Sequence, residues 1–387
     1  MIGRRTASGW ALRLALAGGV LATIALAACG GGGNDTAGTG GSSGGALVAG
    51  YSECPPSGSA SELTGAGSTF ILPLMSKLVD QYKKDCGVQI NYQGVGSGAG
   101  INQIAAKTLD FAGTDGIMTA QQEAAATAAG GAILHIPLTL GPEAVVVNLP
   151  GISAGQLKLT GDVLADVYLK NITNWNDDRI KAINPGVNLP DTKITVVHRA
   201  DGSGTTFIFT NYLSKVSSEW AQRVGFATTV SWPGDVGGQG NDGVAGQVRQ
   251  LPGSIGYVEL AYAKQTGLTW VQIKNKAGNF VSPTLEGASN AAAGVDLPDD
   301  MKVLVTDSAN PQAYPITGFS WGLAYVNAQD VAKGRTLAYF LWWAVHDGQK
   351  LSTPLDYPPL PADAVKKAEA QILSLQCGGQ PCLSKGQ

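Results

Sequence analysis

From about residue 60 onward, the apolar positions of the chain follow helical and strand periods in alternation. In residues 70–84, Phe70, Leu74, Leu78 and Tyr82 are spaced four apart, which predicts an amphipathic helix with Pro73 in its first turn. Residues 88–95 alternate apolar and polar side chains as a strand does, and residues 143–150, 193–200 and 253–260 are candidates for buried strands. Repeated strand–helix units predict an α/β fold with mixed sheets.

The first residues have the layout of an export signal. Arg4, Arg5 and Arg13 precede an apolar run at residues 14–26, which is too short to span a bilayer comfortably. The run ends in "LAAC", and small residues before Cys29 resemble a bacterial lipobox, in which the cysteine becomes the lipidated first residue. We therefore expect residues 1–28 to be a lipoprotein signal peptide and the protein to be anchored at the extracytoplasmic face of the membrane. The alternative is an ordinary cleaved signal with a chance cysteine.

A segment rich in glycine and serine follows the signal. Residues 30–45 read "GGGGNDTAGTGGSSGG", which cannot bury apolar surface. A glycine-rich coil of this length reaches roughly 20 to 25 Å. Residues 29–60 are therefore expected to tether a folded body to its lipid anchor.

Composition and charge limit the classes of molecule that the protein is expected to bind. With 44% apolar and 14% charged residues over 387 positions, the chain is long enough for two domains with real cores. Its net charge is -3, and removal of residues 1–28 leaves 23 basic and 29 acidic residues. Such a chain has no basic field for nucleic acid or anionic lipid, so an anion would have to be held by local groups.

Four cysteines remain beyond Cys29. An even number outside the cytosol predicts disulfides, and the short spacing of Cys377 and Cys382 makes them the natural local pair. Cys54 with Cys86 then follows by elimination. A zinc site is the alternative, although no histidine lies near either pair.

Three loops share one composition and one place in the pattern. "TGAGSTF", "GVGSGAG" and "DGSGTTF" each precede a predicted helix and combine glycine with hydroxyl side chains. Free N–H groups at the positive end of a helix form a natural seat for phosphate or sulfate. Any one of these loops alone is more often an ordinary N-cap. "GVGSGAG" lacks the third glycine spacing of the dinucleotide motif G-x-G-x-x-G, and no P-loop motif occurs in the sequence. The candidate anion-binding residues in these loops are Thr69, Phe70, Ser97, Ser203, Gly204 and Thr205.

Two charged residues strengthen the anion-site hypothesis. Arg199 offers a forked donor that suits oxyanions, and Asp115 follows a probable strand. Asp201 is expected either to orient Arg199 through a salt bridge or to cap a turn. Alone, Arg199 would read as a surface ion pair and Asp115 as a helix cap.

At this point the motifs resemble those of a known family, the PstS-type phosphate-binding receptors of bacterial ABC phosphate importers. The motifs, in order, are "GAGSTF", "NYQGVGSGAG", "DFAGTD", "RADGSGTTFIFTNYLSKV", "GQGNDGVAGQVRQLPGSIGYVELAYAK" and "YPITGFSW". The resemblance implies a type II periplasmic-binding-protein fold with two lobes, each a mixed sheet flanked by helices, and a ligand cleft between them. It implies a monomer that binds inorganic phosphate and delivers it to a permease, with no cofactor, metal or catalytic residue. The family's ligand positions carry over onto Thr69, Phe70, Ser97, Asp115, Arg199, Ser203, Gly204 and Thr205, with Phe70 and Gly204 acting through backbone N–H groups.

The resemblance also implies discontinuous lobes. We expect lobe 1 to comprise residues 61–141 and 315–387, and lobe 2 residues 142–314. Residues 316–326 look like the returning strand, and residues 335–351 look like a core helix of lobe 1 and not a membrane helix.

The chain departs from the family pattern at two positions, and two other functions are alternatives. His198 stands where a second basic residue is usual, and Thr114 lies in "AGTD" in place of "GASD". The alternatives are a receptor for another oxyanion, such as sulfate or molybdate, and a phosphate-ester hydrolase using Ser203, His198 and Asp201. The hydrolase is disfavoured because these three residues crowd into one short stretch. Asp115 is expected to select phosphate, since it can accept a hydrogen from P–OH that ionised sulfate lacks.

Overall fold

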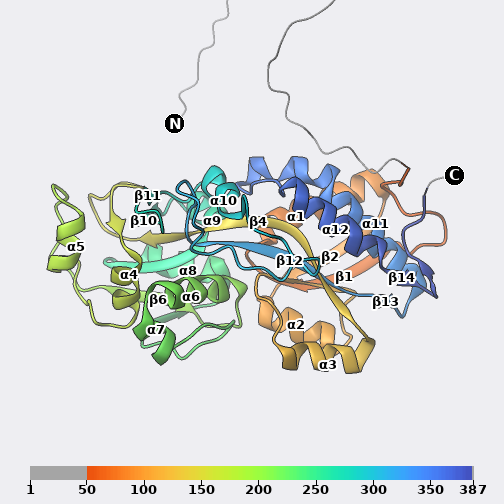
Figure 1. The fold of residues 1–387 in the computed structure, drawn as a ribbon, viewed down its shortest axis with the longest axis horizontal. Coiled ribbons are helices and arrows are strands. Elements are labelled where there is room, and N and C mark those ends of the chain that lie inside the picture. The colour runs from red at the N-terminus through yellow and green to blue at the C-terminus, as the bar shows by residue number, and fades with distance from the viewer. Residues whose placement is uncertain (1–49, 386–387) are drawn as a thin grey trace, which may run out of the picture. The chain divides into compact units, whose positions relative to one another are not determined.

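The structure is a computed structural model that describes residues 50–385 (Figure 1). The described residues belong to one compact unit. The signal peptide, Cys29 and most of the expected tether lie outside the described residues.

A mixed sheet of nine strands runs through the described chain in the order β2-β1-β3-β12-β4-β8-β6-β7, with β9 paired to β4. Its strands are β1 (Glu62–Gly67), β2 (Gln89–Gly94), β3 (Phe111–Thr114), β4 (Ile133–Val147), β6 (Thr195–Arg199), β7 (Val236–Gly238), β8 (Ser254–Glu259), β9 (Thr269–Trp270) and β12 (Thr317–Tyr325). β1 runs parallel to β2 and β3, and β6 runs parallel to β7 and β8. β4 and β12 are antiparallel to each other and to their outer neighbours. The predicted α/β fold with mixed strand pairing is confirmed.

β4 joins the two sets of parallel strands. Its first part, as far as Pro142, pairs with β12, and from Glu143 to Val147 it pairs with β8. The long yellow and blue strands that cross the middle of Figure 1 are β4 and β12. Both strands are almost wholly buried.

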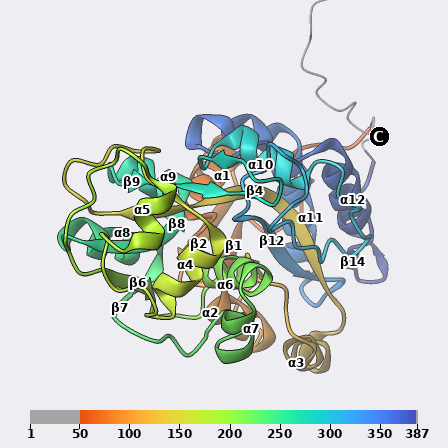
Figure 2. The same ribbon diagram turned by 60° about the vertical axis from the view of Figure 1, so that its left-hand side comes forward.

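Helices cover both faces of the sheet. Around β1, β2 and β3 lie α1 (Leu72–Cys86), α2 (Ser97–Ala105), α3 (Ala120–Gly130), α11 (Val331–Val345) and α12 (Ala362–Leu373). In both views α1, α11 and α12 lie on one side of these strands, and α2 and α3 on the other (Figures 1 and 2). The remaining helices are α4 (Gly161–Tyr168), α5 (Asp178–Ile183), α6 (Gly204–Val216), α7 (Ser218–Arg223), α8 (Gly240–Gln250), α9 (Leu260–Gln265) and α10 (Leu285–Ala292).

Short elements complete the described chain. Two small sheets contain β5 (Lys158–Leu159), β10 (Gln272–Lys274) and β11 (Phe280–Val281), and β13 (Asn327–Ala328), β14 (Gln376–Cys377) and β15 (Gln380–Pro381). Two 3-10 helices, η1 (Asp347–Leu351) and η2 (Thr353–Leu355), connect α11 to α12.

The first helix begins later than its apolar pattern predicted. α1 starts at Leu72, with Pro73 in its first turn, and ends at Cys86, after which Gly87 caps it with a left-handed φ of 72°. Leu74, Leu78 and Tyr82 are buried as expected. Phe70 continues the apolar stripe but precedes the helix, because residues 69–72 form a turn in which Leu72 N–H bonds the carbonyl of residue 69.

The apolar helix near the C-terminus packs inside the protein. α11 is buried from Thr336 to Val345, which confirms the prediction of a core helix. Among residues 50–385 no helix has both the length and the apolarity that a membrane crossing requires.

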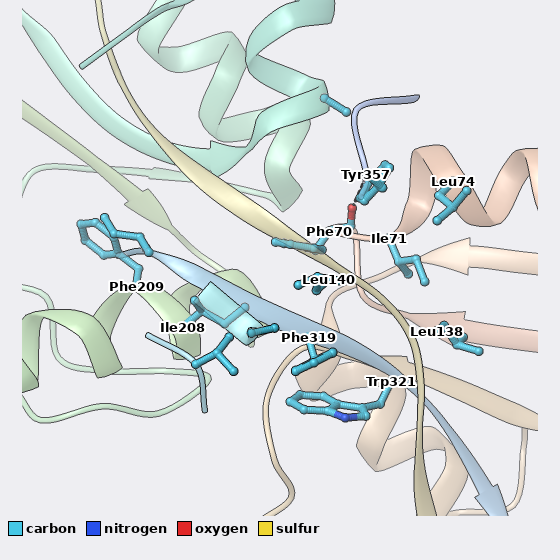
Figure 3. Close-up of a cluster of buried hydrophobic side chains, with 14 of the residues drawn as sticks. Phe70, Ile71, Leu74, Leu138, Leu140, Ile208, Phe209, Phe319, Trp321 and Tyr357 are labelled. Atoms are coloured by element: carbon cyan, nitrogen blue, oxygen red, sulfur yellow. Dashed lines mark hydrogen bonds between the residues drawn. The ribbon is translucent and has the colours of Figure 1, made fainter. Parts of the chain in front are cut away.

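One hydrophobic cluster extends from α1 across β4 and β12 to α6. Figure 3 shows Phe70 and Leu140 between α1 and β12, with Phe319 on β12 near Ile208 of α6. A Cβ placed on Gly318 would lie 2.6 Å from a side-chain carbon of Ile208, so this glycine permits the close packing of β12 on α6. The loops at the starts of α1 and α6 are therefore held on a shared core.

Both predicted disulfides are present. Cys54 bonds Cys86 across a separation of 32 residues, and Cys377 bonds Cys382. The first bond attaches the segment before β1 to the end of α1.

Candidate anion-binding site

Two of the three predicted loops lie directly at helix N-termini. Ser97 is the first residue of α2 after Gly96, whose φ is 89°, and Ser203 is the N-cap of α6. Ser97, Gly204 and Thr205 therefore fall in first turns, where backbone N–H groups have no acceptor within the helix. These placements confirm the sequence prediction for the two helices.

The third loop differs from expectation. Thr69 and Phe70 were expected at the start of a helix, but the N-cap of α1 is Ile71 and both residues precede it. The reason is the turn closed by the Thr69 carbonyl, followed by Pro73 in the first helical turn. Thr69 and Phe70 are nevertheless buried at the end of β1 nearest α2.

The starts of α2 and α6 touch each other. Gly98 N–H donates to the carbonyl of Gly202 at 2.9 Å. A Cβ on Gly204 would lie 2.6 Å from Ser97 Oγ and closer still to Asp115 Oδ2. Only glycine at position 204 permits this approach, which brings two helix N-termini and a carboxylate together.

Asp115 directly follows β3 and is 1% exposed. Ser68 Oγ lies 2.6 and 2.7 Å from its two carboxylate oxygens, Ser320 Oγ donates to Oδ1 at 2.6 Å, and Ser97 Oγ donates to Oδ2 at 3.3 Å. Burial raises the pKa of Asp115 to about 6, against the lowering effects of the hydroxyl donors and of Arg199. Three hydroxyl hydrogens serve about four lone-pair positions, so the carboxylate can accept one further hydrogen bond.

Arg199 ends β6 and is 3% exposed, so it is not a surface residue. Its Nε donates to Asp201 Oδ1 at 2.7 Å, its Nη2 donates to Asp201 Oδ2, and its Nη1 donates to Thr205 Oγ1 at 3.2 Å. Asp201 also accepts from Gly240 N–H at 3.1 Å. Burial alone would raise the pKa of Asp201, but the pairing with Arg199 lowers it below its usual value. The structure thus shows the ion pair, and Asp201 orients the guanidinium.

Ser203 caps α6 in a way that leaves its hydrogen available. Its Oγ accepts from Thr206 N–H at 3.0 Å. Because a hydroxyl has one hydrogen and two lone pairs, Ser203 can donate to a ligand while it caps the helix.

Sequence reasoning missed several residues that complete the site. Asn241, on α8, donates through Nδ2 to Thr69 Oγ1 at 2.9 Å, and Tyr262, on α9, donates to the Thr69 carbonyl at 2.6 Å. Ser68 and Ser320 both lie in quoted motifs, yet neither was recognised as a partner of the carboxylate. Because the partners lie far apart along the chain, no local signal pairs them.

Two further carboxyl groups lie nearby in the core. Glu143 on β4 faces Glu259 on β8 in the strand register, and both are 0% exposed. Within the described chain, Glu143 Oε1 and Oε2 and Glu259 Oε1 have no hydrogen-bond partner. Burial, together with neighbouring carboxylates, raises the pKa of each well above its usual value.

The two departures from the family pattern have local roles. The His198 ring stacks on Trp232 at 4.9 Å between centroids, and its Nδ1 lies 3.0 Å from the Arg199 carbonyl oxygen. Thr114 Oγ1 donates to the Gly116 carbonyl at 2.8 Å and so shapes the turn that carries Asp115. In residues 50–385 no group of three or more His, Cys, Asp or Glu side chains has an arrangement that could hold a metal ion.

Comparison with known proteins decides the family. The sequence matches the PBP superfamily domain over residues 41–347. It is 45% identical over 326 residues to the phosphate-binding protein PstS of Xylella fastidiosa strain 9a5c, covering 83% of this chain and 88% of that protein. The chain belongs to the PstS family. Another PstS protein, from Pasteurella multocida strain Pm70, is 45% identical over 81% of this chain and 90% of its own.

Solved structures agree with the PstS assignment at the level of the fold. A high affinity periplasmic phosphate-binding protein (PfluDING), solved bound with phosphate at pH 8.5, aligns with a TM-score of 0.65 and 22% identity. The alignment covers 82% of this PstS-family chain and 96% of that protein. The predicted two-lobed periplasmic-binding-protein fold is therefore confirmed.

Proposed function

We propose that this protein captures inorganic phosphate between two lobes and delivers it to the permease of an ABC phosphate importer. The observation that carries the proposal is the convergence of three glycine and hydroxyl loops, a buried guanidinium and a buried carboxylate with one free acceptor position. The PstS relatives, which are named for phosphate binding, support the same ligand.

The proposed ligand set is that expected from the sequence. It comprises Thr69, Phe70, Ser97, Asp115, Arg199, Ser203, Gly204 and Thr205. Phosphate stripped of water needs a replacement for nearly every hydrogen bond it loses. Hydrogen bonds to a charged group contribute about 1.5 to 3 kcal/mol each, so five or six with good geometry can exceed the roughly 8 kcal/mol of micromolar binding even after the costs of ordering and closure.

A titration with matched variants tests this set. Calorimetry of the mature protein should give a 1:1 phosphate complex with micromolar or tighter affinity. Thr205→Val should weaken it roughly 10-fold or more, because one donor to a charged group is lost. Thr210 on the same helix is equally buried and donates to the Thr206 carbonyl, so Thr210→Val should leave phosphate affinity unchanged. Equal effects of both variants would contradict the assignment.

The lobes are proposed as residues 61–141 with 315–387, and residues 142–314. Support comes from the antiparallel pair of β4 and β12: β4 changes its partner from β12 to β8 after Pro142, and β12 begins opposite this point, at Thr317. In this division the ligand groups before residue 141 belong to lobe 1, and those from Arg199 to Thr205 belong to lobe 2. Small-angle scattering with and without phosphate should show a smaller radius of gyration in the complex.

A receptor for sulfate or molybdate is not favoured, because the PstS relatives are named for phosphate binding, and competition calorimetry tests this alternative. A hydrolase has less support. His198 stacks on Trp232, and Asp201 is bound to Arg199, so neither side chain is arranged to activate Ser203. We propose that the protein is a binding protein and not an enzyme. Release of p-nitrophenol from p-nitrophenyl phosphate by the pure protein would contradict this.

The protein is further proposed to work as a monomer anchored outside the cytoplasm through lipidated Cys29. The lipobox-like "LAAC" and the glycine-rich segment after it support the anchor. Labelled palmitate should enter the wild-type protein and not Cys29→Ser, which should also leave the membrane fraction.

A further inference from the structure

Asn241 connects the two halves of the proposed site. It is the second residue of α8, is 0% exposed, and has partners for every polar atom of its side chain. Nδ2 donates to Thr69 Oγ1 at 2.9 Å and to Thr205 Oγ1 at 3.1 Å, while Oδ1 accepts from Glu259 N–H at 2.9 Å. Because a backbone N–H can only donate, Oδ1 must face Glu259, and the amide nitrogen must face the two threonines.

As a result, the hydroxyl groups of Thr69 and Thr205 can act only as donors toward a further partner. Thr69 Oγ1 accepts from Asn241 Nδ2 and, at 3.3 Å, from Asn241 N–H. Thr205 Oγ1 accepts from Asn241 Nδ2 and from Arg199 Nη1 at 3.2 Å. A hydroxyl has two lone pairs and one hydrogen, so when both lone pairs are occupied, the hydrogen has to be donated to some other acceptor.

We propose that Asn241 is a positioning residue that forces the hydroxyls of Thr69 and Thr205 to act as donors to the bound anion. This inference rests on the proposed ligand set. A threonine free to rotate can turn a lone pair toward an anion, which repels it. Occupying the lone pairs removes that unfavourable orientation: for Thr205, which shares the proposed lobe 2 with Asn241, before the anion binds, and for Thr69 as the lobes close.

Tyr262 acts on the same loop. Its hydroxyl donates to the Thr69 carbonyl at 2.6 Å. That carbonyl shares a peptide group with the N–H of Phe70, and a hydrogen bond to the carbonyl polarises the peptide and strengthens its N–H as a donor. In the proposed division into lobes, Asn241 and Tyr262 both reach from lobe 2 to Thr69 in lobe 1. These contacts form only when the lobes meet, so the donor geometry is completed on closure.

The chain offers a matched control. Asn275 is also buried, at 4% exposure, and its Nδ2 donates to the carbonyls of Pro311 at 2.9 Å and Ala313 at 3.1 Å. Its Oδ1 accepts a backbone N–H, from Asn279 at 3.0 Å. It reproduces the bonding of Asn241 without touching the proposed ligand set.

Phosphate calorimetry on single and combined variants tests the inference. Asn241→Ala should weaken phosphate binding roughly 10- to 100-fold, the equivalent of about one donor to a charged group. Asn275→Ala should change affinity less than about threefold, even where it lowers the melting temperature as much. In a protein that carries both Thr69→Val and Thr205→Val, adding Asn241→Ala should reduce phosphate affinity little further, because the hydroxyl groups through which Asn241 acts are absent.

Other calorimetric results would contradict either the positioning role of Asn241 or the proposed ligand set. An undiminished cost of Asn241→Ala in the double-valine background would refute the positioning role and indicate a structural one. If Thr69→Val and Thr205→Val bind phosphate as tightly as the wild-type protein does, the proposed ligand set is wrong. If both variants weaken phosphate binding and Asn241→Ala does not, the ligand set stands and the positioning role of Asn241 is wrong. Should Asn241→Ala not fold, Asn241→Asp keeps the shape and the acceptor for Glu259. Its carboxylate attracts both hydroxyl hydrogens, so wild-type phosphate affinity in this variant would overturn the inference.

Discussion

Sulfate binding by the wild-type protein is expected to increase as the pH falls toward about 6 and to level off below it. The group responsible is Asp115, whose pKa burial raises to about 6. Above that pH the carboxylate is charged and has an acceptor position that a P–OH group can fill but a fully ionised sulfate cannot. Below it, the carboxyl group carries a hydrogen of its own and can donate to a sulfate oxygen.

The size of the effect follows from the hydrogen count at Asp115. Ser68, Ser97 and Ser320 supply three hydrogens to the carboxylate, which leaves about one acceptor position toward the ligand. Binding sulfate then requires uptake of one proton. Half of the Asp115 carboxyl groups carry a proton at the pKa, and well above it each pH unit lowers that fraction tenfold, so sulfate affinity should fall about 160-fold between pH 6 and pH 8.5.

Calorimetric titration with sulfate between pH 5 and pH 8.5 measures this slope, because sulfate keeps its charge throughout. Asp115→Asn should bind sulfate with little pH dependence, as the amide can donate at every pH. It should also keep phosphate binding, with the loss of about one hydrogen bond, or roughly 10- to 100-fold. Asp299→Asn, which alters an exposed carboxylate on the surface, is the control and should behave like wild type. A flat wild-type profile, or a tenfold slope that persists in Asp115→Asn, would refute the role of Asp115.

Three further predictions follow from packing and linkage. Gly204→Ala should reduce phosphate affinity about 100-fold or more with an unchanged circular dichroism spectrum, since its Cβ would crowd Ser97 and Asp115 and force the helix starts apart. Glu143 should carry a proton at neutral pH, because burial raises its pKa. The folded state then holds a proton that the unfolded state releases, so the free energy of unfolding should decline as the pH rises from about 5. Glu143→Gln should therefore melt near the wild-type temperature at pH 5 and above it at pH 8, and a wild-type pH slope in this variant would contradict the assignment. Loss of the Cys54–Cys86 disulfide, which closes a loop of 32 residues, should lower the free energy of unfolding measured with denaturant by about 3 to 4 kcal/mol, and an unchanged value would contradict this.

Most of the fold and the loops of the proposed site were predictable from the sequence, because their signals are local. Ser203, Gly204 and Thr205 lie within a single strand–loop–helix unit, and so do Arg199 and Asp201. Their residue types and spacing determine the local geometry. Alternation of strand and helix periods likewise indicated the fold class without any knowledge of strand order.

The supporting residues were not predictable in this way. Asn241 bonds Thr69 from 172 positions away, and Ser320 bonds Asp115 from 205 positions away. Asparagine after a glycine reads locally as a turn residue, and serine within an apolar strand reads as a tolerated polar position. Only the strand order, which places β12 beside β3 and packs α8 against β6 and β8, brings these two residues to the proposed site.

Hydrogen-bond complementarity, more than net charge, has to select the ligand. The guanidinium of Arg199 is already paired with Asp201, and the nearby core holds the carboxyl groups of Glu143 and Glu259. The Tyr357 hydroxyl lies 2.5 Å from the Phe70 carbonyl oxygen and 3.0 Å from Glu259 Oε2, and its one hydrogen serves one of them at a time. A carbonyl oxygen can only accept, so a proton on Glu259 removes this competition, in agreement with its raised pKa. When Glu143 and Glu259 are neutral and Arg199 is paired with Asp201, the bound anion contacts hydrogen-bond donors and one acceptor, the Asp115 carboxylate. The site then selects a tetrahedral anion that can donate a hydrogen bond, as phosphate can and ionised sulfate cannot.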